Sequence, residues 1–272
     1  MPCSAIAMIA PMNKRQILLA GLVFCARFAG SRTIVAQANL PSAPSPSVAV
    51  TVPFVGCASD GQVGPQKAPT GKSLAVAIPA ALAERLAYYK AKFGIGVLAP
   101  RGWHCYSTYG SSGANLFVSP DPMDSKTLLS LNWKGFTGPA VQATLSYGGT
   151  SGRFEVAEVI ARAFPAYKAF TQNVIAEGLE PASDFTFSPY PSDKLTYSGK
   201  NIVEFETPGN AQGLGTDSRL QMNASPIDGV AIISGKDTDL TLITARFSSS
   251  DQDLITAMVA QAEREAAVGR YL

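Results

Sequence analysis

Residues that could do chemistry gather around the single histidine of the chain. His104 stands in the segment RGWHC, and the turn-forming segment GSSG, which holds Ser111 and Ser112, begins six residues further on. A serine beside a histidine that is backed by a carboxylate is the constellation of a serine hydrolase. Ser111 or Ser112 with His104, and with Asp60 or Asp121 behind the imidazole, could therefore form a catalytic triad.

A second interpretation of the same residues involves no catalysis. The serines lack the Gly-x-Ser-x-Gly spacing of a nucleophile elbow, and strand alternation sets His104 on the opposite face from Trp103 and Cys105. One histidine cannot build a metal centre of several histidines. We therefore favour no catalytic residue and expect neither a metal nor a cofactor, with the triad kept as the alternative.

Aromatic and basic residues in the same segment predict a binding surface. Tyr, Trp and Arg are enriched at binding hot spots, and they cluster here in one predicted hairpin, residues 101–113. Trp103 also suits ordinary packing against a neighbouring disulfide. The candidate binding residues are Arg101, Trp103, His104, Tyr106 and Tyr109.

The N-terminal segment has the pattern of a secretory signal. A basic pair precedes an apolar stretch at 17–24, and the small-residue sequence VAQA predicts cleavage after Ala38. We therefore expect residues 1–38 to be removed, with Met12 as an alternative start. Residues 39–50 (NLPSAPSPSVAV) predict a tether rich in Pro and Ser.

Two alternatives to a cleaved signal are a membrane anchor and a lipoprotein signal. Arg27 interrupts the apolar run far short of the roughly 20 residues that a spanning helix needs, so we expect no stable membrane span in the mature chain. Cys25 follows an apolar run as a lipoprotein cysteine would, but the bulky Phe24 occupies a position that normally holds a small residue. The sequence favours a periplasmic or secreted protein.

Only two cysteines, Cys57 and Cys105, remain after residue 38. Exported proteins meet an oxidising environment, so we predict a disulfide between them. The alternative is a reactive thiol at Cys105, activated by the neighbouring His104.

Composition and charge limit the partners. The chain of 272 residues is 46% hydrophobic and 15% charged, which is typical of a globular protein. Four basic residues and no acidic ones precede residue 39, which leaves 18 Lys and Arg against 20 Asp and Glu. Such a slightly acidic chain lacks the basic surface that nucleic acid requires, so we exclude nucleic acid as a partner.

Turn residues and hydrophobic periodicity predict a single α+β domain over 51–272, with an antiparallel sheet of about seven strands and helices packed on its faces. Residues 51–73 predict a loop with one short strand, and 79–93 a helix capped by Gly94. The further elements are strands at 95–99, 115–118, 127–133, 141–147, 195–197, 202–205, 230–233 and 240–247, helices on either side of Pro165, and a closing helix at 251–268 with Ser250 as its N-cap.

Two pairs of acidic residues could also do chemistry. Glu155 and Glu158 stand at a predicted helix start, where acidic residues favour the helix dipole, and Glu204 and Glu206 share one face of a predicted strand. A glycosidase needs two carboxyl groups across a cleft, which spacing along the chain does not show.

A short motif and the order of elements point to a known fold. The segment LAPRGW at 98–103 matches a "Pro-x-Gly-Trp" hairpin opening, and YSGKN at 197–201, the hairpin at 229–247 and the closing helix follow in the same order. Over roughly residues 94–268 the chain resembles the PsbP-like fold, named for an extrinsic protein of the oxygen-evolving photosystem. The resemblance implies a protein that binds or helps assemble other proteins, with no functional residue carried over.

These features favour an exported binding or accessory protein of the cell envelope, whose partner is another envelope protein. The first alternative is a secreted serine hydrolase that uses Ser111 or Ser112 with His104. The second is an inhibitor of an envelope hydrolase, in which the GSSG turn enters a foreign active site.

Overall fold

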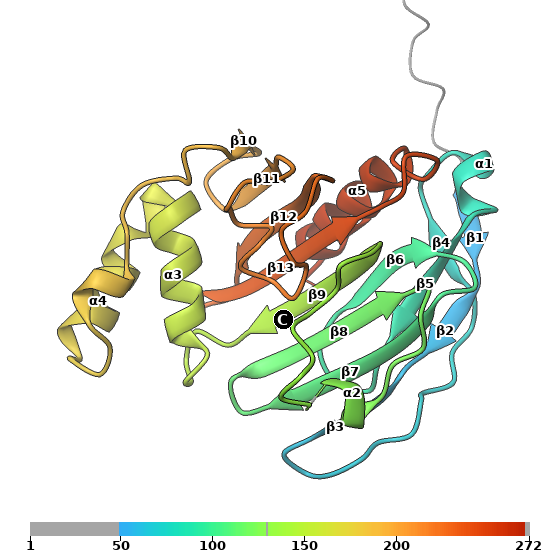
Figure 1. Cartoon of the computed structure of the whole chain (residues 1–272), viewed down its shortest axis with the longest axis horizontal. Coiled ribbons are helices and arrows are strands. Elements are labelled where there is room, and N and C mark those ends of the chain that lie inside the picture. Colours follow the sequence, from blue (N-terminus) through green and yellow to red (C-terminus); the bar gives the residue numbers. More distant parts are fainter. Residues whose placement is uncertain (1–48, 129, 270–272) are drawn as a thin grey trace, which may run out of the picture. The chain divides into compact units, whose positions relative to one another are not determined.

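The computed structural model describes residues 49–128 and 130–269. The expected signal at 1–38 and nearly all of the expected tether lie outside the described residues. Figure 1 shows the described part as strands arranged in sheets, with helices packed beside them. No helix within the described part is long and apolar enough to cross a membrane.

The large sheet has eight strands and forms most of the fold. They are, in chain order, β3 (Ala58–Gly61), β7 (His104–Gly110), β8 (Gly113–Ser119), β9 (Ala140–Ser146), β10 (Lys194–Tyr197), β11 (Ile202–Thr207), β12 (Ile227–Ser234) and β13 (Asp239–Arg246). Their order across the sheet is β10-β11-β12-β13-β9-β8-β7-β3. All neighbours are antiparallel except β3 and β7, which run parallel. The α+β class is confirmed, but the expectation of about seven antiparallel strands is wrong, because an N-terminal strand extends the sheet and makes it mixed.

Two small sheets lie beside the large one in the fold. The first contains β2 (Phe54–Gly56), β5 (Leu86–Lys90) and β6 (Gly96–Pro100), and the second pairs β1 (Val50–Val52) with β4 (Leu74–Val76). The expectation of a single short strand within 51–73 is therefore wrong. Gly and Pro between these short strands mark the corners where the chain changes sheet.

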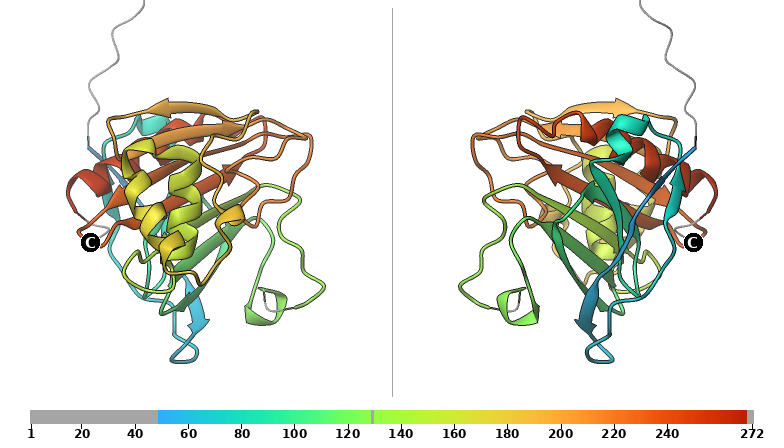
Figure 2. Two further views of the ribbon diagram at one scale, coloured as in Figure 1. Left: turned by 90° about the vertical axis from the view of Figure 1, so that its left-hand side faces the viewer. Right: turned by 90° about the vertical axis from the view of Figure 1, so that its right-hand side faces the viewer.

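Five α-helices occur in the described part: α1 (Ala80–Ala83), α2 (Ser125–Leu128), α3 (Arg153–Ala163), α4 (Lys168–Ala176) and α5 (Leu254–Ala267). A 3-10 turn at Pro165–Tyr167 separates α3 from α4, as Pro165 predicts. The left view of Figure 2 shows α3 and α4 together on one side of the large sheet.

The large sheet is covered on both faces, so its central strands β9, β12 and β13 are buried along nearly their whole length. Its inner face, with Leu116, Val118 and Ile243, packs against β5, β6 and α5 in one continuous core. On the opposite, outer face, residues such as Ala231 and Leu242 pack against α3. Because side chains alternate along a strand, neighbouring residues of β12 and β13 serve two different cores.

The helix expected at 79–93 is wrong, because only Ala80–Ala83 is helical, in α1, and Leu86–Lys90 forms strand β5. Leu86, Ala87 and Tyr89 are fully buried, and β5 pairs with β2 on one side and β6 on the other. Leu82, Leu86 and Tyr89 recur at helical spacing, but a run buried on both faces gives the same pattern. Gly94 has a φ of +78° and lies in the turn between β5 and β6, so it does not cap a helix.

Two further sequence expectations are corrected. The strand expected at 127–133 is wrong, since α2 ends at Leu128 and residues 130–133 belong to no strand. The N-cap of α5 is Asp253, not Ser250, and its side chain makes no capping hydrogen bond. The acidic residues before α5 bind an arginine instead.

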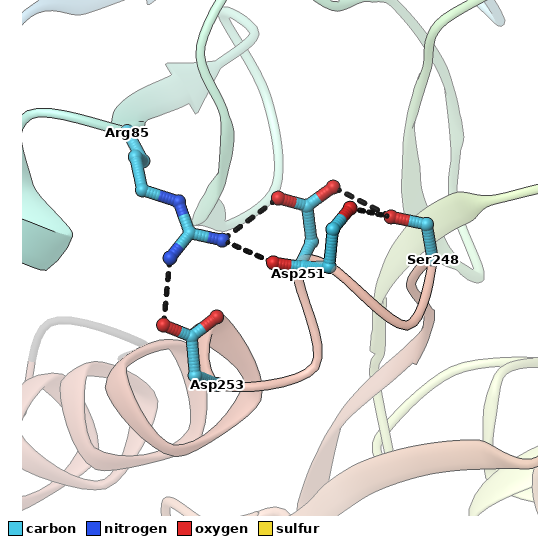
Figure 3. A network of polar contacts seen from close by, with 5 residues as sticks. Arg85, Ser248, Asp251 and Asp253 are labelled. Atoms are coloured by element: carbon cyan, nitrogen blue, oxygen red, sulfur yellow. Dashed lines mark hydrogen bonds and ion pairs between the residues drawn. The ribbon is translucent and has the colours of Figure 1, made fainter.

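That arginine, Arg85, fastens the start of α5 to the chain between α1 and β5 (Figure 3). Its guanidinium donates to Asp253 Oδ2 at 2.6 Å, to Asp251 Oδ1 at 2.8 Å and to the Ser250 carbonyl at 2.7 Å. Ser248 Oγ donates to the second oxygen of Asp251 at 2.8 Å. The hydrogen bonds from Arg85 and Ser248 hold the pKa of Asp251 below its ordinary value.

The predicted disulfide between Cys57 and Cys105 is confirmed, with the two Cα atoms 5.4 Å apart. Cys57 lies where the chain leaves β2 and enters β3, and Cys105 lies on β7. The bond therefore fixes the crossing from the small sheet to the large one, and it leaves no reactive thiol at Cys105.

Candidate functional site

The structure does not bring the residues of the candidate triad together. His104 begins β7, whereas Ser111 and Ser112 lie in the exposed turn after its other end. Six residues of strand separate His104 from that turn by about 20 Å. Ser119 pairs with His104, so Asp121 follows at the histidine's end of the hairpin, away from the serines.

Asp60, the other candidate carboxylate, lies on β3 opposite Thr108 and accepts a hydrogen bond from the Gly61 amide at 2.8 Å. Neither Ser111 nor Ser112 therefore lies within hydrogen-bond reach of His104 for general-base catalysis. The exposed GSSG turn is compatible with the inhibitor alternative, which stays a prediction.

Three of the five candidate binding residues hold the fold together. Arg101 donates to the Ala83 carbonyl at 3.0 Å. Trp103 is half-buried and meets the Phe247 ring edge-on at 5.9 Å. Tyr109 donates to the Gly64 carbonyl at 2.6 Å. These contacts occupy the side chains within the molecule, which leaves His104 and Tyr106 of the original set for a partner.

His104 and Tyr106 point to the outer face of the large sheet, the face opposite Cys105. His104 is exposed, and Tyr106 is half-buried beside Phe117 of β8. In Figure 1 only the short helix α2 lies in front of β7, while α3 and α4 lie beyond one end of β7 and β8. The loop that contains α2 covers this part of the outer face.

This loop lies between β8 and β9; its described residues, 120–128 and 130–139, are called the aromatic loop below. Its Trp133 and Phe136 rings stand edge-to-face, 5.3 Å apart, and both contact Phe117, at 6.3 and 6.0 Å. Edge-to-face aromatic pairs gain stability beyond their buried area. The cluster buries Phe117 almost fully and fixes the base of a loop that otherwise projects from the sheets in both views of Figure 2.

A pocket of about 160 Å³ opens beside the aromatic cluster. Apolar side chains supply much of its wall, and Ser119 donates to the Asp121 carbonyl at 2.7 Å to shape the floor. The lining residues are Ser119, Asp121, Pro122, Met123, Thr127, Leu128, Trp133, Gly135, Phe136, Thr137, Gly138 and Pro139. The pocket thus belongs almost wholly to the aromatic loop.

A second loop, residues 208–226 between β11 and β12, braces the aromatic loop. The Phe136 amide donates to the Arg219 carbonyl at 2.7 Å, and the Gln221 amide returns a bond to the Phe136 carbonyl at 2.8 Å. Asn223 Nδ2 donates to the Thr137 carbonyl at 2.7 Å. This ladder holds the aromatic residues in place although neither loop is a strand there.

Arg246 at the end of β13 anchors both loops from below. Its guanidinium donates to the carbonyls of Phe136 and Gln221, and the residue is only 2% exposed. Burial lowers the pKa of Arg246 from its ordinary value. Each loop thus gives one carbonyl oxygen to this buried cation, and losing the guanidinium would leave both oxygens without this donor.

Next to the aromatic cluster the outer face carries a polar network. Gln142 Nε2 donates to Asn115 Oδ1 at 3.1 Å and to Thr144 Oγ1 at 2.9 Å, and Thr144 donates to Asn115 at 2.7 Å. The Arg219 amide donates to Gln142 Oε1 at 2.7 Å. The network thus attaches the second loop to β9 and gives a rigid floor to the outer face.

A charged cluster beside α3 is engaged in structural contacts. Arg162 stacks on the Tyr190 ring at 4.0 Å, and the Tyr190 hydroxyl donates to Asp217 at 3.1 Å. Burial and the neighbouring Asp217 carboxylate raise the pKa of Tyr190 to about 12. Asp193 accepts hydrogen bonds from Thr207 Oγ1 at 2.7 Å and from the Leu214 amide at 2.9 Å. Each of these side chains already has a partner within the fold.

Sequence reasoning missed the aromatic loop as a site. Trp133 was expected at the end of a strand and Phe136 in a turn, because TLLSLNW has the composition of a strand. The available signal was the density of Pro and Gly on both sides, which predicts a long loop, and long ordered loops are usually functional. No group of His, Cys, Asp and Glu within the described part has the geometry of a metal site.

Comparison with known protein families and with curated protein sequences found no match. The function of the chain is therefore inferred from the chemistry of its own surfaces.

Proposed function

We propose that the protein is an exported binding or accessory protein of the cell envelope, and that it docks a partner protein through the aromatic loop. The observation that carries this proposal is the pocket of about 160 Å³ beside the aromatic cluster. Small-molecule sites usually measure roughly 300–1,000 Å³. A pocket well below that range suits one apolar side chain of a partner better than a whole substrate.

Exposed apolar side chains on the two loops support a protein partner. Leu131 of the aromatic loop is 91% exposed, and Met222 of the second loop, residues 208–226, is 57% exposed. Met222 stands between Gln221 and Asn223, which both bind the aromatic loop. Apolar side chains around an aromatic anchor are the typical centre of an interface, and Trp and Met are enriched there.

Export is supported by the disulfide between Cys57 and Cys105, since such bonds persist in oxidising compartments. The predicted signal at 1–38 points the same way. The resemblance of residues 94–268 to the PsbP-like fold, whose members mostly bind or help assemble other proteins, adds a prior for a binding role.

The experiment is a comparative capture from the exported fraction of the native host. The disulfide-bonded chain from residue 39 onward is immobilised as wild type, as Trp133→Ala and as Val63→Ala, where Val63 is an exposed apolar residue of another loop. We expect the wild type and Val63→Ala to retain similar amounts of one protein. Trp133→Ala should retain at least tenfold less of it.

Thermal unfolding of each variant checks that the fold is intact. Equal capture by Trp133→Ala, with an unfolding midpoint close to that of the wild type, would overturn the proposal.

A further inference from the structure

The two edge strands of the large sheet differ in whether another segment of the chain covers them. At the β3 edge the chain folds back, and Ser59 exchanges two backbone hydrogen bonds with Gln66, at 3.1 and 2.7 Å. Exposed sheet edges invite pairing with other chains, and covering an edge with a loop is a common protection. The β3 edge is therefore closed by its own chain.

The β10 edge has no such cover in the described part of the chain. Strand β10 pairs only with β11, and Figure 1 shows it at the margin of the sheet. The Ser198 amide donates to the Ile202 carbonyl at 3.0 Å. Bonded pairs alternate along an antiparallel ladder, so Thr196 also belongs to a bonded pair and faces β11. The amides and carbonyls of Leu195 and Tyr197 consequently point away from the sheet.

A groove of about 240 Å³ runs beside this open edge, between β10–β12 and α5. Its floor includes Ile255 and Val259 of α5. Its charged walls are acidic, with Glu204, Glu206 and Asp228 against one lysine.

The acidic residues of the groove repel one another. The lysine, Lys194, already pairs with Glu206 at 2.7 Å. Burial and the nearby Glu206 raise the pKa of Asp228, and burial and the nearby Glu204 raise the pKa of Glu263 on α5. Positive charge entering the groove would relieve this repulsion.

We propose that the β10 edge is a docking site for an extended segment of a partner protein that carries Lys or Arg at alternate positions. The segment adds a strand beside Leu195 and Tyr197 and exchanges backbone hydrogen bonds with them. Every second side chain of an added strand points to the same face. The basic side chains therefore enter the acidic groove, and the intervening ones lie beside the exposed Tyr197 ring.

A second copy of this chain fits the edge less well than a basic segment. Two β10 strands paired across a twofold axis would bring two acidic grooves side by side. Lys194 of each copy is already paired within its own groove. Charge complementarity therefore selects a cationic partner strand over self-association.

This docking site goes beyond the function proposed above, because the two surfaces share no residue. A partner could use both, and either proposal can fail without the other.

The test measures binding of a fluorescent peptide of about nine residues, with lysine at every second position and threonine or valine between, by fluorescence anisotropy. Two matched peptides serve as controls, one with glutamate for lysine and one with N-methylated amides along its pairing edge. The N-methylated peptide keeps the charge but cannot pair as a strand. We expect the parent peptide to bind at least tenfold more tightly than either control, and its affinity to fall as salt is added.

Two variants of Tyr197 test the edge from the protein side. Tyr197→Pro removes an outward amide without removing a bond to β11, since proline is tolerated on edge strands with that orientation. We expect it to weaken binding about fivefold, the worth of one net hydrogen bond, whereas Tyr197→Ala keeps the amide and stays within about twofold. Glu204→Gln is expected to weaken binding about threefold at low salt.

Three results would overturn the proposal. The first is equal binding of the parent and the N-methylated peptide, which would mean that charge alone attracts it. The second is equal binding of the glutamate peptide. The third is a dimer in sedimentation velocity that Tyr197→Pro dissolves, which would assign the edge to a second copy.

Discussion

Removing the disulfide is expected to destabilise the protein by about 4 kcal/mol. The variant replaces Cys57 and Cys105 by alanine. In the chain-entropy model, a bond that closes a loop of the observed sequence separation of 48 residues stabilises the fold by about 4 kcal/mol. This is a large share of the 5–15 kcal/mol that is typical of a folded domain.

The position of the disulfide predicts which part of the fold loses the most stability without it. The Cys57 amide donates to the Lys90 carbonyl at 2.9 Å, so the cysteine is joined both to β5 of the small sheet and to β7 of the large one. Without the disulfide, only hydrogen bonds and packing hold the crossing between the sheets. We therefore expect proteases to cut first between residues 57 and 73, where Gly and Pro interrupt the strands.

The assay is urea unfolding of three samples at one pH: the oxidised wild type, the reduced wild type and the double alanine variant. Reduced wild type and variant should lose about the same free energy of unfolding, and reductant should leave the variant unchanged. If both stay within about 1 kcal/mol of the oxidised protein, the disulfide does not restrain the unfolded chain as reasoned here.

Two further substitutions test contacts away from the disulfide. Arg246→Met removes the guanidinium that binds the carbonyls of Phe136 and Gln221, and should cost about 1–3 kcal/mol; hydrogen exchange should quicken at Gln221 but not in the core of β13. Asp251→Asn should cost about 1 kcal/mol at pH 7 in urea unfolding, because it weakens the contact with Arg85. Since the pKa of Asp251 is lowered on folding, its contribution is present above the unfolded pKa of about 3.9 and is lost as the pH falls through the folded pKa. The two proteins should then be equally stable, and a difference that persists in full at pH 2 would contradict this origin.

The second half of the fold is readable from the sequence because its signals are local. The hairpins β10–β11 and β12–β13 have turn residues between short apolar strands, and Gly199 and Gly235 both have positive φ in those turns. Helices α3 and α5 show apolar residues at helical spacing, with Pro165 marking the end of α3. Each of these elements follows from residues next to one another in the chain.

The first half of the fold is harder to predict from the sequence, because pairing with segments distant in the chain determines its secondary structure. The segment 86–90 satisfies a helical spacing and a buried strand equally, and only its pairing with β2 and β6 selects the strand. The parallel pairing of β3 with β7 likewise joins segments that no local pattern relates. In the sequence, only the predicted Cys57–Cys105 disulfide indicated that the segment around β3 lies beside β7.

The sequence predicted part of the candidate site. His104 and Tyr106 were chosen for residue type, and strand alternation correctly put His104 on the face opposite Cys105. Arg101 and Trp103 have the same residue types but serve the fold, because backbone carbonyls and Phe247 lie within their reach. Residue type alone does not separate a binding aromatic from a packed one.

The most direct test of the central claim is site-specific photo-crosslinking through the aromatic loop. Benzoylphenylalanine replaces Leu131, which is 91% exposed, and in a second protein it replaces Val63, which is 70% exposed. We predict one discrete adduct with an envelope protein from position 131, none from position 63, and loss of the adduct when Trp133→Ala is added. The same adduct from both positions, or an adduct that survives Trp133→Ala in a folded protein, would contradict the account.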